Sequence, residues 1–268
     1  MNLTAPAAAR PNARMTTLFD LTGKTAIVTG SSKGIGQAIA ERLAEHGARV
    51  VISSRKIEPC REVAASINTR WPGRAIAVAA NISDKTQLQA LVDETRSAFG
   101  QVDVLICNAA TNPHYGPMEG ITDEAFRKTL ENNILSNHWL IQMVAPEMRE
   151  RRDGSIIIIS SIAGLQGNQV IGAYGVSKAA DMQLARNYAR ELGPHNIRVN
   201  CIAPGLVKTD FARTFWENPE AEKRASAGKA LRRLGDPDDL AGAAIYLASR
   251  AGAWTTGQTL VVDGGTVC

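Results

Sequence analysis

Tyr174 and Lys178 are the residues of this 268-residue chain whose types and spacing most directly suggest chemistry. They lie four positions apart in a helical pattern, and side chains at i and i+4 share one helical face. A tyrosine transfers protons near neutral pH only if its pKa falls a few units from about 10, which takes about 3–4 kcal/mol. An ammonium about 4 Å away supplies about 4 kcal/mol at an effective dielectric constant of about 20. The spacing predicts a proton-transfer pair, although by itself it is also typical of an ordinary surface pair.

A glycine-rich turn at 29–36 has the spacing G-x-x-x-G-x-G, through Gly30, Gly34 and Gly36. It joins a β-branched run to a helical pattern, where a turn needs positive φ and lets backbone N–H groups approach a pyrophosphate. The N-terminus of the following helix adds a favourable partial charge. A plain strand-to-helix turn is the alternative, and the second strand that follows favours a dinucleotide site.

The end of the second strand distinguishes the two nicotinamide dinucleotides. Sites that prefer NAD(H) usually carry an acidic residue there, which bonds the ribose hydroxyls. Here the chain has Ser54, Arg55 and Lys56, with no carboxylate. Arg55 can bind a 2′-phosphate, and Lys33 of the glycine-rich turn can add a second cation. We therefore expect NADP(H) to be favoured over NAD(H); the alternative is that both cations are ordinary solvated charges.

The elements that must position these groups alternate between short apolar runs and helical patterns. The predicted strands are Thr25–Val28, Arg49–Ile52, Ala75–Ala79, Val102–Ile106, Ser155–Ile159, Ile197–Ile202 and Thr259–Val262. Helical patterns separate them, the longest within Asp123–Arg151 and at Ala173–Leu192. Apolar strands separated by helices indicate a parallel sheet covered on both sides. The predicted fold class is α/β: a single-domain Rossmann fold with a doubly wound seven-stranded parallel sheet and helices on both faces.

The N-terminal end differs in composition from the rest of the chain. Residues 1–19 are rich in alanine, proline and asparagine, and we expect a flexible extension without a signal peptide. The sequence leaves open whether Met1 or Met15 is the natural start. No linker divides the remainder, so residues 20–268 are predicted to form one Rossmann-type domain.

Composition argues against several classes of protein. The net charge of 30 − 26 = +4 is small and dispersed, so we expect no nucleic-acid partner. No apolar run is long enough to span a bilayer, so we expect no membrane partner. The four cysteines and four histidines are scattered without metal-ligand spacing. We expect no metal site, and reduced thiols in a cytoplasmic protein.

Further motifs, in the same order along the chain, make it similar to the short-chain dehydrogenase/reductase (SDR) family. They are the turn at 29–36, Cys107-Asn108-Ala109-Ala110, Asn133, Ser161, Tyr174 with Lys178, Ala203-Pro204-Gly205 with Thr209, and Val262-Asp263-Gly264-Gly265. The resemblance runs from about Leu21 to Gly265. Within the family the chain most resembles NADP-dependent members that act on dicarbonyls and aromatic ketones, through segments 54–56, 108–113 and 232–235.

The resemblance implies a role for each of four residues. Tyr174 is implied to be the general acid in reduction and the base in oxidation, and Lys178 to lower its pKa and bond the nicotinamide ribose. Ser161, at the family's usual interval before Tyr174, is implied to polarise the carbonyl. Asn133 is implied to hold a helix kink and a water that links Lys178 to solvent. The neighbours that compete for the last two roles are Ser160 and Asn132.

The resemblance also implies a set of cofactor contacts. Asn108 is implied to brace the sheet under the cofactor, and Asn81 to meet the adenine. The expected cofactor-binding residues are Gly30, Ser32, Lys33, Gly34, Ile35, Gly36, Ser54, Arg55, Lys56, Asn81, Ile82, Asn108, Ala109, Tyr174, Lys178, Pro204, Gly205, Val207 and Thr209. The chain departs from the family at Ala110, usually a glycine, and at Cys107, which we expect to be a packing residue.

These features predict an NADP(H)-dependent oxidoreductase that interconverts a ketone and a secondary alcohol by hydride transfer, with Tyr174 as acid and base. Substrate choice is expected in the loops 111–120, 162–171 and 206–229. The last loop is predicted to be a lid whose aromatic residues either contact an apolar substrate or merely pack the lid. The sequence does not identify the carbonyl.

Two alternative functions remain open at this point. One is a 3-oxoacyl-[acyl-carrier-protein] reductase, whose two basic docking positions fall here on Arg152 and His195, so that only one is an arginine. The other is a non-catalytic NADP-binding sensor or scaffold. The family resemblance implies a homotetramer or a dimer in either case.

Overall fold

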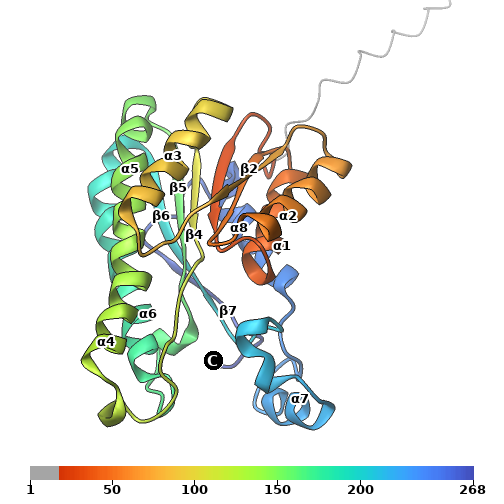
Figure 1. Ribbon diagram of the computed structural model, residues 1–268, viewed down its shortest axis with the longest axis vertical. Helices are drawn as coiled ribbons and strands as arrows, with labels where there is room; N and C mark the ends of the chain where they lie inside the picture. The colour runs from red at the N-terminus through yellow and green to blue at the C-terminus, as the bar shows by residue number, and fades with distance from the viewer. Residues whose placement is uncertain (1–17) are drawn as a thin grey trace, which may run out of the picture.

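A sheet of seven parallel strands forms the centre of residues 18–268, the part of the chain that the computed structural model describes (Figure 1). The strands are β1 (Thr25–Thr29), β2 (Arg49–Ser54), β3 (Ala75–Ala79), β4 (Val104–Cys107), β5 (Gly154–Ile159), β6 (Ile197–Pro204) and β7 (Thr259–Val262). Their order is β3-β2-β1-β4-β5-β6-β7, so the chain reverses its direction across the sheet between β1 and β4. Open α/β sheets bind ligands at the carboxyl ends of the strands beside such a reversal.

Helices cover both faces of the sheet (Figure 1). They are α1 (Gly34–Glu45), α2 (Ile57–Arg70), α3 (Lys85–Phe99), α4 (Asp123–Leu130), α5 (Ser136–Arg151), α6 (Gly172–Leu192), α7 (Pro219–Ser226) and α8 (Pro237–Ala248). One buried apolar cluster joins the sheet to α1, α2 and α8, and a second joins its other face to α3, α5 and α6. Every residue of β1, β4 and β5 is buried, as continuous apolar strands between two helical layers require. The predicted α/β Rossmann fold with seven parallel strands is confirmed.

The element boundaries lie close to the predicted ones. β1, β2 and β6 run one or two residues further than predicted, to Thr29, Ser54 and Pro204. Each added residue carries the strand toward the carboxyl edge, where the expected cofactor contacts begin. The expected extension at 1–19 lies outside the described residues, apart from its last two positions, and so do both candidate starts.

The long helix predicted within 123–151 is interrupted. Between α4 and α5 the chain forms a π-helical turn, η2 (Glu131–Leu135). Such turns widen the helix locally and are frequent at functional sites. Asn132 and Asn133 lie in this turn and are both buried. The π-turn therefore places the side-chain amides of Asn132 and Asn133 in the interior of the protein.

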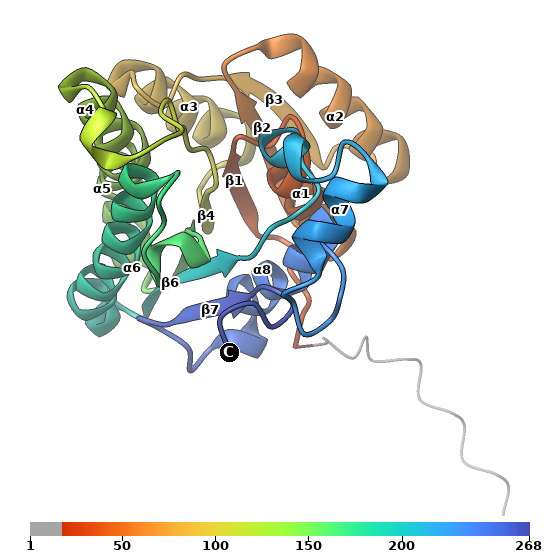
Figure 2. The same ribbon diagram turned by 90° about the horizontal axis from the view of Figure 1, so that it is seen from below.

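Two segments stand beyond the carboxyl edge of the sheet. One is α4, and the other consists of the 3-10 helix η5 (Asp210–Phe215) and α7. Figures 1 and 2 show α4 and α7 at the same end of the molecule and on opposite sides of it. Among residues 18–268, no helix combines the length and apolarity needed to cross a membrane.

Candidate active site

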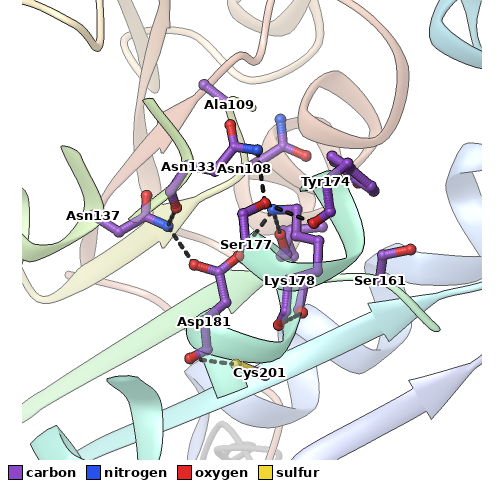
Figure 3. Close-up of polar contacts among 12 residues, drawn as sticks. Asn108, Ala109, Asn133, Asn137, Ser161, Tyr174, Ser177, Lys178, Asp181 and Cys201 are labelled. Atoms are coloured by element: carbon purple, nitrogen blue, oxygen red, sulfur yellow. Dashed lines mark hydrogen bonds and ion pairs between the residues drawn. The ribbon is translucent and has the colours of Figure 1, made fainter. Parts of the chain in front are cut away.

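Tyr174 and Lys178 project from the first turns of α6, next to the carboxyl end of β5 (Figure 3). The Lys178 side chain is 2% exposed, and its ammonium lies 5.5 Å from the centroid of the Tyr174 ring. Lys178 Nζ donates hydrogen bonds of 2.9 Å to the Ile159 carbonyl and to Asp181 Oδ2. The structure thus brings the predicted pair together, with Lys178 buried and Tyr174 half-buried.

The pKa of the Tyr174 phenol is raised, which corrects the expectation that Lys178 would lower it overall. Burial is the largest cause, because it penalises the phenolate. The Lys178 ammonium and a hydrogen bond with Ser161 act in the opposite direction, and the Asp181 carboxylate adds to the rise. The spacing of Tyr174 and Lys178 could not reveal this burial. In this state Tyr174 holds its proton at neutral pH.

Ser161 lies beside Tyr174 (Figure 3), whereas the hydroxyl of its neighbour Ser160 bonds the backbone of α6. Ser160 is buried and donates 2.7 Å to the Lys178 carbonyl, so its hydroxyl ties β5 to α6. Ser161 begins the 3-10 turn η3 (Ile162–Gly164), which packs closely on α6. A Cβ at Gly164 would come within 2.6 Å of the α6 backbone, so glycine there permits this packing.

Asn133, and not its neighbour Asn132, reaches α6 from the π-turn. Its Nδ2 donates to Ser177 Oγ at 3.0 Å, and Ser177 Oγ in turn donates to the Tyr174 carbonyl at 2.7 Å. Asn132 instead bonds the Thr111 hydroxyl, and its Oδ1 has no hydrogen-bond partner. The contact with the helix of the catalytic pair therefore belongs to Asn133.

Two buried polar residues of this region did not feature in the sequence predictions. Asp181 is fully buried, pairs with Lys178, and accepts 3.0 Å from Asn137 Nδ2 (Figure 3). The signal that could have found it is its i+3 spacing from Lys178, a carboxylate on the same helical face. Asn137 lies one turn beyond Asn133 and carried no comparable signal.

The glycine-rich turn packs directly against the end of β4. Asn108 Nδ2 donates 2.9 Å to the Thr29 carbonyl and 3.1 Å to the Gly30 carbonyl. A Cβ at Gly36 would lie 2.5 Å from Asn108 Nδ2 and 2.6 Å from the Gly30 carbonyl oxygen. Gly30 has φ +65°, in the left-handed region that favours glycine. Asn108 therefore braces the turn through its side chain, and Ala109 lies against Gly30.

The N-terminus of α1 can accept an anion. Its N-cap is Lys33, and no side chain caps the helix. The first N–H groups of a helix lack intrahelical partners, so this end offers free donors and a positive partial charge. Ser32, Gly34 and Ile35 line the same end, each half-buried. These observations fit a nucleotide pyrophosphate.

The charges expected to meet a 2′-phosphate lie at the end of β2 and in the glycine-rich turn. Arg55 and Lys56 are exposed, and in the described part of the chain Arg55 forms no ion pair. Lys33 is paired with Asp210 of η5 at 2.9 Å, and both side chains are largely exposed. The Ser54 hydroxyl donates to the Lys56 carbonyl, which fixes the start of the turn. Within residues 18–268, Arg55 and Lys56 are thus the two cations at this end of the site that form no ion pair, whereas Lys33 is paired.

The remaining expected cofactor contacts lie along the same edge. Asn81 and Ile82 follow β3 and are half-buried. The residues expected at the nicotinamide end follow β6: Pro204, Gly205, Val207 and Thr209. Thr209 Cγ2 would lie 3.2 Å from a Cβ at Gly34, so the β6 loop reaches the glycine-rich turn. A cavity of about 150 Å³ borders Gly205 and Val207, and neither Tyr174 nor Lys178 lines it.

The aromatic residues of the predicted lid divide between two roles. Phe211 is 55% exposed, and its ring centroid lies 5.8 Å from that of Tyr174. Trp216 Nε1 donates 3.0 Å to the Thr209 carbonyl and so anchors the lid to the chain after β6. Phe215 is exposed. One aromatic residue therefore faces the catalytic tyrosine, while another holds the segment in place.

Cys107 and Cys201 are buried in the sheet, and burial raises the pKa of both thiols. They are neutral packing residues at ordinary pH, as we expected for Cys107. Within residues 18–268, no three His, Cys, Asp or Glu side chains are grouped so that they could hold a metal ion.

Comparison with protein families and curated relatives gives a consistent match. A family model described as "Enoyl-(Acyl carrier protein) reductase" matches residues 30–267. "Dehydrogenase/reductase SDR family member 4" of Homo sapiens is 40% identical over 255 residues, which covers 94% of this chain and 90% of that protein. The protein of the same name from Caenorhabditis elegans is 37% identical over 246 residues, covering 91% and 95%.

Solved structures give the same result. A 7α-hydroxysteroid dehydrogenase, complexed with NADH and 7-oxo glycochenodeoxycholic acid, superposes with a TM-score of 0.88 at 40% identity and covers 92% of this chain and 96% of that one. A 3-oxoacyl (acyl-carrier-protein) reductase from Agrobacterium tumefaciens with NADP bound has a TM-score of 0.88 at 34% identity, covering 94% and 98%.

Proposed function

Because the chain belongs to the short-chain dehydrogenase/reductase family, whose members are oxidoreductases of alcohol and carbonyl groups, we propose that it interconverts a ketone and a secondary alcohol with NADP(H). The observation that carries the proposal is the half-buried Tyr174 next to the buried Lys178, with Ser161 beside them and an uncapped α1 N-terminus at the same edge of the sheet.

Tyr174 donates its phenolic proton to the carbonyl oxygen in reduction and takes it back in oxidation. Its raised pKa keeps the proton in place until the oxygen gains negative charge. The Ser161 hydroxyl bonds the same oxygen and stabilises the charge that develops there. The Lys178 ammonium places a positive charge next to the Tyr174 ring. Asn133 fixes the backbone of α6 at Tyr174 through the Ser177 hydroxyl.

The residues that would hold the dinucleotide fit its parts. The α1 N-terminus and the turn through Gly30, Gly34 and Gly36 would hold the pyrophosphate, and Arg55 would bind the 2′-phosphate. A bound nicotinamide dinucleotide would supply or accept the hydride. SDR proteins bind nicotinamide cofactors, and the solved neighbours include both NADH and NADP complexes, so the preference for NADP(H) rests on Arg55 and on the lack of an acid after β2.

An apolar ketone fits the surroundings of Tyr174 best. Phe211 covers the tyrosine from the lid, and Tyr115 of the loop before α4 is exposed at the same site. Aromatic side chains with a few polar groups are typical of sites that bind apolar small molecules.

Reduction of a carrier-bound 3-oxoacyl group is the second candidate. The matching NADP-bound reductase and the family model's description support it. Arg152 is exposed at the end of α5, and its guanidinium donates 2.9 Å to the Pro194 carbonyl, next to His195. One arginine beside a histidine binds an acidic carrier protein more weakly than two arginines would.

A screen of NADPH oxidation tests the proposal. Purified protein is mixed with ketones, diketones, quinones and 3-oxoacyl thioesters, free and carrier-bound, and each assay is repeated with NADH. We expect turnover of free ketones or diketones with NADPH favoured. Activity on carrier-bound groups alone would favour the second candidate, and a strong NADH preference would contradict the role of Arg55.

Three further expectations stay predictions. They are the homotetramer or dimer, the cytoplasmic location, and the catalytic roles of the individual site residues. Tyr174, Lys178, Ser161 and Asn133 are all present and grouped, which supports turnover.

A further inference from the structure

Asp181 is a buried charge that the proposed mechanism does not use. Its side chain has no exposed surface, and its Oδ2 lies 2.9 Å from Lys178 Nζ. They lie three positions apart on α6, so one helix supplies both members of the ion pair. A buried carboxylate is unfavourable unless it is paired and hydrogen-bonded. This one is both, which indicates a specific arrangement.

The other carboxylate oxygen of Asp181 is fixed by a second helix. Asn137 Nδ2 donates 3.0 Å to Asp181 Oδ1 and 2.7 Å to the Asn133 carbonyl oxygen (Figure 3). A continuous set of bonds therefore runs from Lys178 through Asp181 and Asn137 to the π-turn. The amide of Asn137 keeps its protons and does not carry them onward. The set can hold groups in place, and it is not a proton path.

The ion pair also changes how much positive charge acts on Tyr174. A lone ammonium beside a phenol stabilises the phenolate, and a carboxylate beside that ammonium opposes it. The pKa of Lys178 is raised: burial lowers it, but the charges of Asp181 and Tyr174 outweigh burial, so the ammonium persists. The other titratable groups that face this pair are Tyr115 of the loop after β4 and the neutral thiols of Cys107 on β4 and Cys201 on β6.

We propose that Asp181 is a positioning residue that holds the Lys178 ammonium and balances its charge, so that the pair, together with Asn137, sets the field at Tyr174. The inference rests on the proposed role of Tyr174 as acid and base. It assigns to Asp181 and Asn137 a function that the catalytic tyrosine, lysine, serine and asparagine do not cover.

The substitution Asp181→Asn tests it by removing the charge and keeping the shape. Without the Asp181 carboxylate, one negative charge fewer repels the Tyr174 phenolate, so the pKa of Tyr174 falls. Tyr174 loses its proton at lower pH, and the alkaline limb of kcat/KM for ketone reduction moves down by about one pH unit. The KM for the ketone stays within about twofold, because the carboxylate is buried beneath the site.

A matched control is Asp93→Asn, which makes the same charge change on the exposed face of α3. It should leave the alkaline limb where it is in the wild type. An unchanged limb in folded Asp181→Asn would overturn the proposal, since a merely structural carboxylate would reduce the yield of folded enzyme without moving the limb.

A double-mutant cycle keeps the proposal testable if Asp181→Asn fails to fold. Urea unfolding midpoints are compared for Lys178→Met, Asp181→Leu and the double variant. Each single change leaves one buried charge unpaired, so the double variant should be more stable than either single variant. Additive losses would overturn the pairing. The cycle needs no turnover. If the wild type reduces no carbonyl, the proposed function is contradicted, and the cycle still shows whether Asp181 and Lys178 stabilise each other.

Discussion

The nucleotide end and the catalytic end of the site are built in different ways. At the nucleotide end the donors are backbone N–H groups at a helix N-terminus, the shape comes from glycines, and the charged side chains are exposed. At the catalytic end, side chains from α5, α6 and the π-turn form a buried network around an ion pair. A backbone cradle tolerates changes in exposed neighbours. A buried network couples its members, so one lost charge or hydroxyl affects the others.

The largest contrast is expected at the two adjacent serines of the catalytic end. Ser161→Ala removes the hydroxyl that bonds the carbonyl oxygen, and we expect kcat to fall by about 10²–10³. Ser160→Ala removes the second hydrogen bond to the Lys178 carbonyl, which keeps its bond within α6, and lowers the unfolding free energy by about 0.5–1.5 kcal/mol. Steady-state kinetics and urea unfolding of both variants give the comparison. Equal losses of kcat would contradict the separate roles of the serines.

At the nucleotide end, Arg55→Ser should weaken the binding of NADPH and leave the binding of NADH almost unchanged. The lost charge-assisted bond is worth about 1.5–3 kcal/mol, so the KM for NADPH should rise roughly tenfold to a hundredfold. Arg61→Ser is the control, an exposed arginine of α2 that faces Glu58 of its own helix. If the KM values for NADPH and NADH rise equally in Arg55→Ser, Arg55 does not recognise the 2′-phosphate.

A smaller effect is expected from Gly36→Ala. Its Cβ would lie 2.5 Å from Asn108 Nδ2, so the turn must shift at a cost of about 1–3 kcal/mol, and the KM for NADPH should rise. Gly242→Ala in α8 meets no atom within 4 Å and should stabilise the protein by about 0.5–1 kcal/mol. Thermal unfolding of both variants measures the difference. A harmless Gly36→Ala would show that the turn is not closely packed.

The same contrast explains what the sequence could and could not predict. Glycine spacing and apolar runs are local, and they indicated the sheet, the helices on both faces and the turn through Gly30–Gly36. The positions of Tyr174 and Lys178 on one helical face follow from helical geometry alone. The raised pKa of Tyr174, the π-turn and the bond between Asp181 and Asn137 depend on how α5 and α6 pack, and no local pattern specifies that. The i+3 spacing of Asp181 from Lys178 is local and permits the ion pair, but it does not specify that the pair is buried.

The most direct test of the account is Tyr174→Phe, which keeps the ring and its contact with Phe211 and removes only the phenolic hydroxyl. NADPH binding, followed by nucleotide fluorescence, and ketone reduction are measured on the same preparation. We predict a Kd for NADPH within about twofold of the wild type. Reduction should be slower by about 10²–10⁴, because the proton donor is gone. Reduction at the wild-type rate would contradict the assignment of Tyr174 as the acid.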